Sequence, residues 1–169
     1  ISDASRIDAE LSRTRFVPVD MVSLSRTLVG ARRERGEDRV VVTTHGRGPW
    51  VVAGDAARLE RVLVNLLDNA ASFSPADGEI TLTIERQSDD VVLSVEDKGP
   101  GIAASAREKV FERFHSLRPE DEDFGRHSGL GLAIARTIAI AHEGALVATG
   151  RADGHQGARL MLYLPAYIE

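Results

Sequence analysis

The residues with the clearest chemical potential are two asparagines, Asn65 and Asn69, in a segment with a strong apolar stripe. In a helix, a spacing of four residues places both carboxamides on one stripe, one turn apart. Their oxygens are hard ligands of the type that Mg²⁺ accepts, usually together with nucleotide phosphates and water. An isolated pair of this kind is more often two surface amides without a role, so the metal hypothesis depends on the motifs that follow.

A glycine motif follows a predicted strand, with Asp97 first and then Gly99 and Gly101. The glycines allow the backbone to turn sharply and to approach a flat ligand closely. A buried carboxylate at Asp97 can accept a hydrogen bond from the exocyclic amine of adenine, whereas guanine would present a carbonyl oxygen to it. The spacing is not that of the Gly-x-Gly-x-x-Gly dinucleotide fingerprint, and an ordinary Asp-Gly turn is the alternative.

A second glycine motif opens another predicted helix, with Ser128, Gly129, Leu130 and Gly131 at its start. The first amides of a helix are free, and its dipole is positive at that end, so the position suits a phosphate. A flexible linker ahead of a helix is the alternative interpretation.

Two phenylalanines, Phe111 and Phe114, lie between the glycine motifs and flank Arg113. We expect both rings to anchor a loop. The Arg113 guanidinium can bind a phosphate through two parallel hydrogen bonds, with a surface ion pair as the alternative. Arg113 and Asn65 are the candidate catalytic residues, because both side chains could contact the phosphates of a bound nucleotide. The five histidines show no metal-ligand spacing, and the sequence has no Cys, which excludes thiolate metal sites.

The elements that must position these residues follow from hydrophobic periodicity and from turn residues. Predicted helices cover residues 1–15, 20–35, 55–72, 104–114 and 129–142. Predicted strands cover residues 39–44, 50–53, 79–86, 91–96, 145–149 and 159–164. The two longest helices each begin at an aspartate, Asp20 and Asp55, which is a favourable N-cap. Because hairpins alternate with helical crossovers, we predict an α/β (α+β) two-layer sandwich, with one mixed sheet and helices on one face.

The composition limits the class of protein. A chain of 169 residues can form one domain with its own core. A net charge of −5 without a basic stripe argues against nucleic acid as the main partner. No apolar run approaches the roughly 20 residues that span a bilayer, so we expect no membrane insertion of this chain. Because the sequence does not begin with Met, we interpret it as a fragment of a longer protein.

The four motifs, in this order, resemble the catalytic ATP-binding domain of sensor histidine kinases, within the gyrase, Hsp90, histidine kinase and MutL superfamily. Residues 65–70 resemble the N box, 97–101 the first glycine box, 111–114 the F box and 129–132 the second glycine box. The resemblance covers about residues 18–165. It implies a Bergerat-type fold in which the segment between the glycine boxes forms a mobile ATP lid.

The resemblance also implies a division of the chain and a set of roles. Residues 1–17 would be the C-terminal end of a dimerisation and phosphoacceptor helix with its linker, and residues 18–169 the ATP-binding domain. Asn69 would be the Mg²⁺ ligand, Asn65 a helper near metal and phosphates, and Asp97 the adenine contact. The residues implied to hold Mg-ATP are Asn65, Asn69, Asp97, Gly99, Gly101, Ser128, Gly129, Leu130 and Gly131.

The implied activity is transfer of the ATP γ-phosphate to a histidine on the dimerisation domain, which lies outside this sequence. The fragment is expected to bind ATP without phosphorylating itself. The implied partners are that dimerisation domain, in a full-length homodimer, and a cognate response regulator. The implied location is the cytoplasmic portion of an inner-membrane sensor protein.

Two alternatives stay open. One is an ATPase or an anti-sigma serine kinase of the same fold, although these usually carry Glu where this chain has Asn65. The other is a degenerate ATP-binding module, because Ser72 and Ser116 stand where the family usually has a basic residue. Both replacements predict weak, Mg²⁺-dependent ATP binding, in the micromolar to millimolar range.

Overall fold

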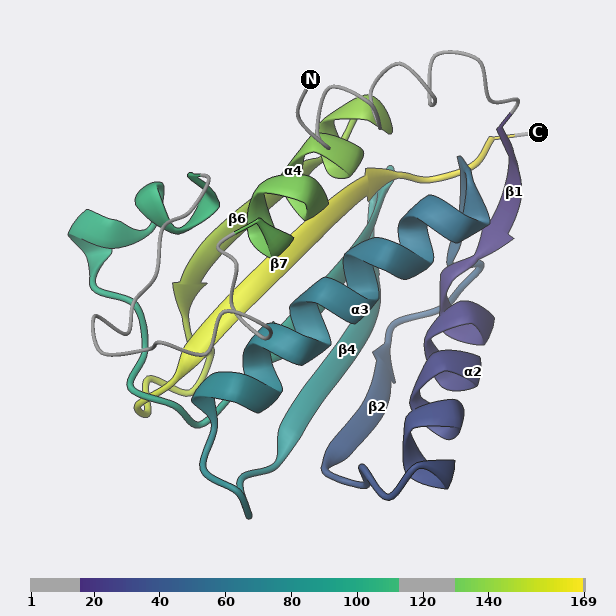
Figure 1. The fold of residues 1–169 in the computed structure, drawn as a ribbon. Helices are drawn as coiled ribbons and strands as arrows, with labels where there is room; N and C mark the ends of the chain where they lie inside the picture. The colour runs from purple at the N-terminus through teal and green to yellow at the C-terminus, as the bar shows by residue number, and fades with distance from the viewer. Residues whose placement is uncertain (1–15, 113–129, 169) are drawn as a thin grey trace.

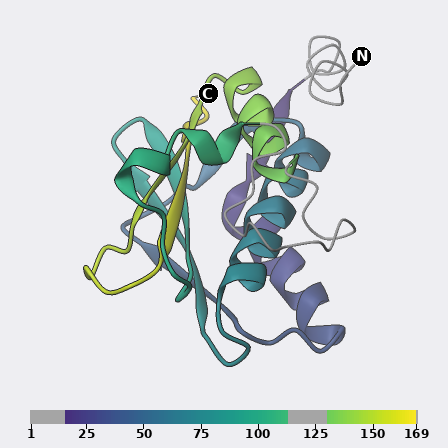
Figure 2. The same cartoon turned by 60° about the vertical axis from the view of Figure 1, so that its left-hand side comes forward.

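A computed structural model of the chain describes residues 16–112 and 130–168. These residues form a mixed five-stranded sheet in the order β2-β4-β5-β7-β6, with β2 and β4 parallel and the other neighbours antiparallel. Its strands are β2 (Val40–His45), β4 (Ile80–Gln87), β5 (Asp90–Glu96), β7 (Ala158–Pro165) and β6 (Ala145–Gly150). The predicted sandwich is therefore confirmed, since the three helices of the described residues cover one face of this sheet (Figures 1 and 2).

The helices are α2 (Met21–Glu34), α3 (Ala56–Phe73) and α4 (Gly131–Ala141). The two predicted N-caps are present: the Asp20 carboxylate accepts hydrogen bonds from the backbone N–H of Val22 and Ser23, at 3.0 and 3.2 Å. Asp55 does the same at the start of α3. Such a cap stabilises a helix by about 1 kcal/mol.

Packing of α3 against the sheet forms the centre of the core. One stripe of α3 is fully buried, and it consists of Leu59, Val62, Leu63, Leu66, Leu67 and Ala70. Alternate residues of β5 meet it from the sheet, namely Val91, Leu93 and Val95. This burial fixes the rotation of α3, so its polar stripe lies at the edge of the core, beside α4.

A second, two-stranded sheet pairs β1 (Val17–Asp20) with β3 (Val51–Gly54) in antiparallel register. The sequence analysis predicted no strand over residues 17–20, where Pro18 lies. Proline lacks a backbone N–H, but it is tolerated in a ribbon that has a partner on one side only. Here Pro18 lies opposite Ala53.

The predicted helix over residues 104–114 is wrong for the part that the structure describes. Two short 3₁₀ turns replace it, η1 (Ala104–Ala106) and η2 (Lys109–Phe111). Each turn is only three residues long, and the second one places Val110 and Phe111 in the core. The predicted helix over 1–15 and most of the predicted lid lie outside the described residues.

The helix predicted over 129–142 begins at Gly131 and ends at Ala141. Among residues 16–112 and 130–168, no helix combines the length and the apolar character that a membrane crossing requires.

Candidate nucleotide site

The N box and the second glycine motif are in direct contact. The Asn65 side-chain Nδ2 donates a hydrogen bond to the Gly131 carbonyl at 3.0 Å, across the interface of α3 and α4. A Cβ on Gly131 would lie 3.8 Å from the Asn65 Cγ. This bond uses one of the two N–H donors of the Asn65 amide and fixes its orientation, and among the described residues no hydrogen bond is made to its Oδ1. The structure thus brings together two motifs that are 66 residues apart in sequence.

The start of α3 and the end of α4 meet at His142. His142 is 4% exposed, its Nδ1 lies 2.8 Å from the Ile138 carbonyl oxygen, and its Nε2 lies 3.1 Å from the Asp55 backbone nitrogen. The ring must therefore be the neutral Nδ1–H tautomer, donating to Ile138 and accepting from Asp55. Burial lowers the pKa of His142, although the Ile138 hydrogen bond and the Asp55 charge oppose this.

A further ring completes that junction. Phe16 stacks on His142 with ring centroids 4.6 Å apart and an interplanar angle of 7°. Together with the Asn65 contact, the junction attaches both ends of α4 to α3, so the two site helices pack side by side.

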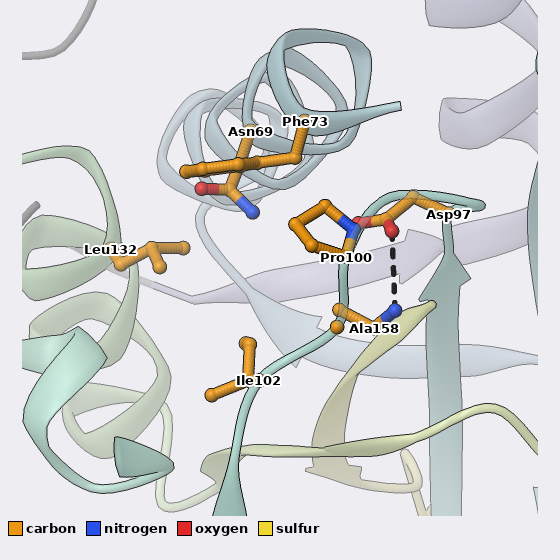
Figure 3. Close-up of a pocket in the computed structure, with 8 residues that line it drawn as sticks. Asn69, Phe73, Asp97, Pro100, Ile102, Leu132 and Ala158 are labelled. Carbon is orange, nitrogen blue, oxygen red and sulfur yellow. Dashed lines mark hydrogen bonds between the residues drawn. The ribbon is translucent and has the colours of Figure 1, made fainter. Parts of the chain in front are cut away.

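Asp97 lies directly after β5 and is 4% exposed. Its Oδ1 accepts backbone hydrogen bonds from Gly99 at 2.8 Å and from Ala158 at 3.1 Å (Figure 3). Neither bond uses Oδ2. Burial raises the pKa of Asp97, while the two N–H donors and the Arg151 charge act in the opposite direction. Oδ1 thus holds the glycine loop, and among residues 16–112 and 130–168 no hydrogen bond is made to Oδ2.

A pocket opens beside Asp97, between the end of α3, the start of α4 and the glycine loop (Figure 3). Its lining residues are Asn69, Phe73, Asp97, Pro100, Gly101, Ile102, Leu132 and Ala158. Most of these side chains are apolar, and Asn69 and Asp97 supply the polar atoms. An apolar cleft with a few polar groups is the usual form of a small-ligand site.

Two glycines allow the backbone segments around Asp97 to approach one another. A Cβ on Gly99 would lie 2.6 Å from the Phe73 carbonyl oxygen. At Gly157, where φ is +150°, a Cβ would lie 2.1 Å from the Asp97 carbonyl oxygen. No side chain fits at either position. Gly99 therefore lets the loop pack against the end of α3, and Gly157 lets the segment before β7 pack against Asp97.

The first phenylalanine of the F box anchors the chain to α4, as predicted. Phe111 is buried, and the Arg136 guanidinium lies 4.9 Å from its ring centroid. The same guanidinium forms an ion pair with Glu108 at 2.8 Å. Residues 108–111 are therefore attached to the helix whose first turn carries Gly131.

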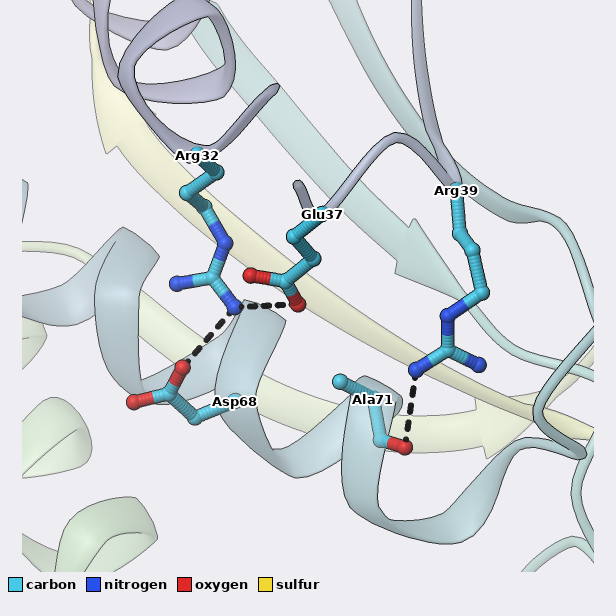
Figure 4. A network of polar contacts seen from close by, with 5 residues as sticks. All are labelled: Arg32, Glu37, Arg39, Asp68 and Ala71. Carbon is cyan, nitrogen blue, oxygen red and sulfur yellow. Dashed lines mark hydrogen bonds and ion pairs between the residues drawn. The ribbon is translucent and has the colours of Figure 1, made fainter. Parts of the chain in front are cut away.

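Two arginines support the C-terminal half of α3 from outside the pocket (Figure 4). Arg32 on α2 contacts both Glu37 and Asp68 at 2.9 Å. Burial alone would lower the pKa of Arg32, but the two carboxylates outweigh it and raise the pKa above its ordinary value. Arg39 donates to the Ala71 carbonyl at 3.2 Å. Both contacts flank Asn69 along α3.

The structure places the predicted site residues as follows. Asn69, Asp97 and Gly101 line one pocket, and Asn65 contacts Gly131 at its edge. Leu130 packs against the core just before α4. Arg113, Ser128 and Gly129 lie outside the described residues, so their roles stay predictions, as do the ligand roles of the others.

Five pocket residues were missed from the sequence: Phe73, Pro100, Ile102, Leu132 and Ala158. Local signals existed for most of them. Phe73 follows Asn69 by one helical turn, and the others except Ala158 lie inside or beside a glycine motif. Ala158 comes from a distant strand, and no local pattern marks it.

Comparisons with known proteins show the family of this chain. A family model described as "Histidine kinase-, DNA gyrase B-, and HSP90-like ATPase" matches residues 54–168. The sensor protein ChvG of Rhizobium meliloti (strain 1021) is 43% identical over 178 residues, covering 98% of this chain and 31% of ChvG. The chain therefore spans about a third of the length of this relative.

Two solved structures are similar over nearly the whole chain. The mycobacterial sensor histidine kinase MprB has a TM-score of 0.74 and 35% identity, covering 91% of this chain and 99% of the solved one. The ATP binding domain of PrrB from Mycobacterium tuberculosis has a TM-score of 0.69 and 25% identity, covering 92% of this chain and 100% of the solved one.

Proposed function

This chain belongs to the family of histidine kinase-, DNA gyrase B- and HSP90-like ATPases, and from that premise we propose that residues 18–169 bind Mg-ATP in the Asp97 pocket. The similar proteins are sensor kinases. We therefore propose that the bound ATP gives its γ-phosphate to a histidine of a separate dimerisation domain. The observation that supports the proposal most directly is that both backbone hydrogen bonds to the Asp97 carboxylate go to Oδ1, so that Oδ2 can accept from a ligand.

Asp97 suits recognition of adenine. Its Oδ1 is held by two backbone N–H groups, and its Oδ2 can accept a hydrogen bond from the exocyclic amine of the base. Phe73, Ile102 and Leu132 supply apolar contacts for a flat ring. Guanine would place a carbonyl oxygen against the carboxylate, which leaves two acceptors unmatched inside the pocket. The site should therefore prefer ATP to GTP.

The phosphates would extend from this pocket along α3 toward the Asn65–Gly131 contact. Asn69 lines the pocket, the Asn65 Oδ1 makes no hydrogen bond to any described residue, and the first turn of a helix such as α4 presents backbone N–H groups. These oxygens fit Mg²⁺, which would supply charge neutralisation and a bridge between phosphate oxygens. Asn69 and Asn65 would hold the ion.

Neither asparagine can take a proton from a nucleophile, because a carboxamide is not a base near neutral pH. The described site thus contributes positioning and charge, which are the main requirements of phosphoryl transfer. The attacking group must come from elsewhere, and this favours a kinase that serves another domain over a hydrolase. Arg113 is proposed as a further phosphate contact.

The similarity to sensor kinases also suggests four proposals about the full-length protein. We propose that residues 1–17 end a dimerisation and phosphoacceptor helix, and that the full-length protein forms a homodimer. We also propose that it phosphorylates a response regulator and that this domain is the cytoplasmic portion of a membrane sensor.

Calorimetric titration of the chain with ATP and GTP, with and without Mg²⁺, tests the nucleotide proposal. Asp97→Asn puts an amide donor in the pocket and should weaken ATP binding by about 30- to 150-fold, from the loss of about 2–3 kcal/mol. Asn69→Ala should remove the Mg²⁺-dependent part of the affinity. Asp38→Asn, in an exposed loop, is the matched charge control. If Asp97→Asn and Asp38→Asn titrate alike, the site is wrongly assigned.

Radiolabelled ATP tests the transfer step. The chain alone should acquire no stable label, whereas a histidine-containing dimerisation domain added to it should become labelled. Label on the isolated chain would contradict the assignment of the nucleophile to another domain. Steady release of phosphate without any acceptor would favour an ATPase instead.

A further inference from the structure

The site-facing stripe of α3 carries one more polar side chain. Arg61 precedes Asn65 by four residues, as Asn65 precedes Asn69. Four residues advance a helix by about 6 Å, so the three side chains form a row along α3. Arg61 is partly exposed, and within the part of the chain that the structure describes its guanidinium has no hydrogen bond or ion pair.

The row runs from the Asp97 pocket toward the start of α3. Phe73 and Asn69 are at the Asp97 pocket, and Asn65 contacts Gly131 one turn further toward the start of α3. A nucleotide with its base in the pocket would place successive phosphates in that direction. Helical side chains lean toward the N-terminus of their helix, so Arg61 reaches beyond Asn65, to where the last phosphate would lie.

The other cations near the site are already engaged or lie at its other end. Arg136 is paired with Glu108 and covers Phe111. Lys98 belongs to the glycine loop beside the base pocket. Position 72, three residues after Asn69, carries a serine and therefore no charge. Arg61 is thus the described cation best placed for a terminal phosphate.

We propose that Arg61 binds the γ-phosphate of ATP and makes this site select a nucleoside triphosphate over a diphosphate. The inference rests on the proposed ATP-binding function and extends it. A guanidinium can donate two parallel hydrogen bonds to one phosphate group. ADP lacks that group, so the contact should contribute to the affinity for ATP and not to the affinity for ADP.

The test compares the dissociation constants for Mg-ATP and Mg-ADP in the same chain. Arg61→Gln should weaken ATP binding by about 10-fold or more, from the loss of a charge-assisted hydrogen bond, and leave ADP binding within about twofold. Arg61→Lys keeps a positive charge and should recover part of the ATP affinity. Arg26→Gln, on the exposed face of α2, removes the same charge away from the site and should change neither constant.

Each outcome is decisive for one of the two proposals. Equal weakening of ATP and ADP by Arg61→Gln, or no weakening of either, overturns the role of Arg61 while nucleotide binding by the parent chain stands. If the parent chain binds neither nucleotide, the proposed function fails and the role of Arg61 fails with it. Thermal unfolding of each free variant checks that the fold is retained.

Discussion

Replacing Gly157 by alanine should disrupt both the stability of the fold and the nucleotide pocket. Gly157 lies against the backbone of Asp97, and its neighbour Ala158 donates the hydrogen bond that holds the Asp97 Oδ1. A methyl group at position 157 must therefore displace the residue on which adenine recognition is proposed to depend.

The magnitude follows from the contacts. The added Cβ would lie 2.1 Å from the Asp97 carbonyl oxygen and 2.5 Å from the Arg151 Cδ, whereas ordinary contact begins at 3.4 Å. The Arg151 side chain can move, but the carbonyl belongs to the backbone. Overpacking of this kind costs about 1–3 kcal/mol. The φ of +150° adds backbone strain for any residue with a Cβ, at about 1–3 kcal/mol.

Gly154 in the same loop offers a matched control. Its φ is +77°, and a Cβ there would meet nothing within 4 Å. Gly154→Ala should thus cost only the left-handed backbone conformation, about 1–2 kcal/mol. Both substitutions restrict the unfolded chain equally, so the difference between the two variants reports the clashes at Gly157 together with any extra strain at its φ of +150°.

Thermal unfolding and ATP titration measure the two effects. For a chain of this size each kcal/mol lowers Tm by about 2–4 °C, so Gly157→Ala should unfold at least several degrees below Gly154→Ala. It should also bind ATP about 5- to 150-fold more weakly, since an unpaired pocket carboxylate costs about 1–3 kcal/mol. Equal Tm values for the two variants, or unchanged ATP affinity in Gly157→Ala, would refute the reasoning.

Three further predictions concern the buried titratable side chains of Asp97, His142 and Arg32. Asp97→Asn keeps an oxygen for both backbone donors, so it should be at least as stable as the parent at pH 7 in urea unfolding. Because burial raises the pKa of Asp97, the parent chain should gain stability relative to this variant as pH falls toward about 4. Because burial lowers the pKa of His142, the unfolded chain binds a proton first as pH falls through about 6.5, and stability is lost. In unfolding at pH 7.5 and 5.5, His142→Gln should show a smaller loss than the parent, and an equal loss would contradict the buried neutral imidazole. Arg32, whose side chain is 5% exposed, bonds two carboxylates, so Arg32→Gln should cost about 1–3 kcal/mol in urea unfolding. Asp68 is 62% exposed, so Asp68→Asn should cost less than about 1 kcal/mol, and the opposite ranking would count against the network.

Much of the local structure could be predicted because its causes are local. The aspartate caps at Asp20 and Asp55, the apolar stripe of α3 and the alternation in β5 each depend on residues within a few positions of one another. Prediction was wrong where a distant contact decided the conformation. Pro18 lies in a strand because β3 pairs with it, and the segment before Phe111 turns tightly because α4 covers that ring.

The sequence by itself determined the kind of protein this is and the residue types of its candidate site. Each motif alone has a common alternative, but the asparagine pair, the two glycine motifs and the phenylalanine motif in this order indicate the chemistry before any fold is known. Only the tertiary structure decided which of these groups meet. The Asn65–Gly131 bond, the junction at His142, and the seating of Asp97 against Ala158 and Gly157 join segments about 60 or more residues apart. Those contacts arise from packing of three helices on one sheet, and packing depends on the whole chain, so no local pattern encodes it.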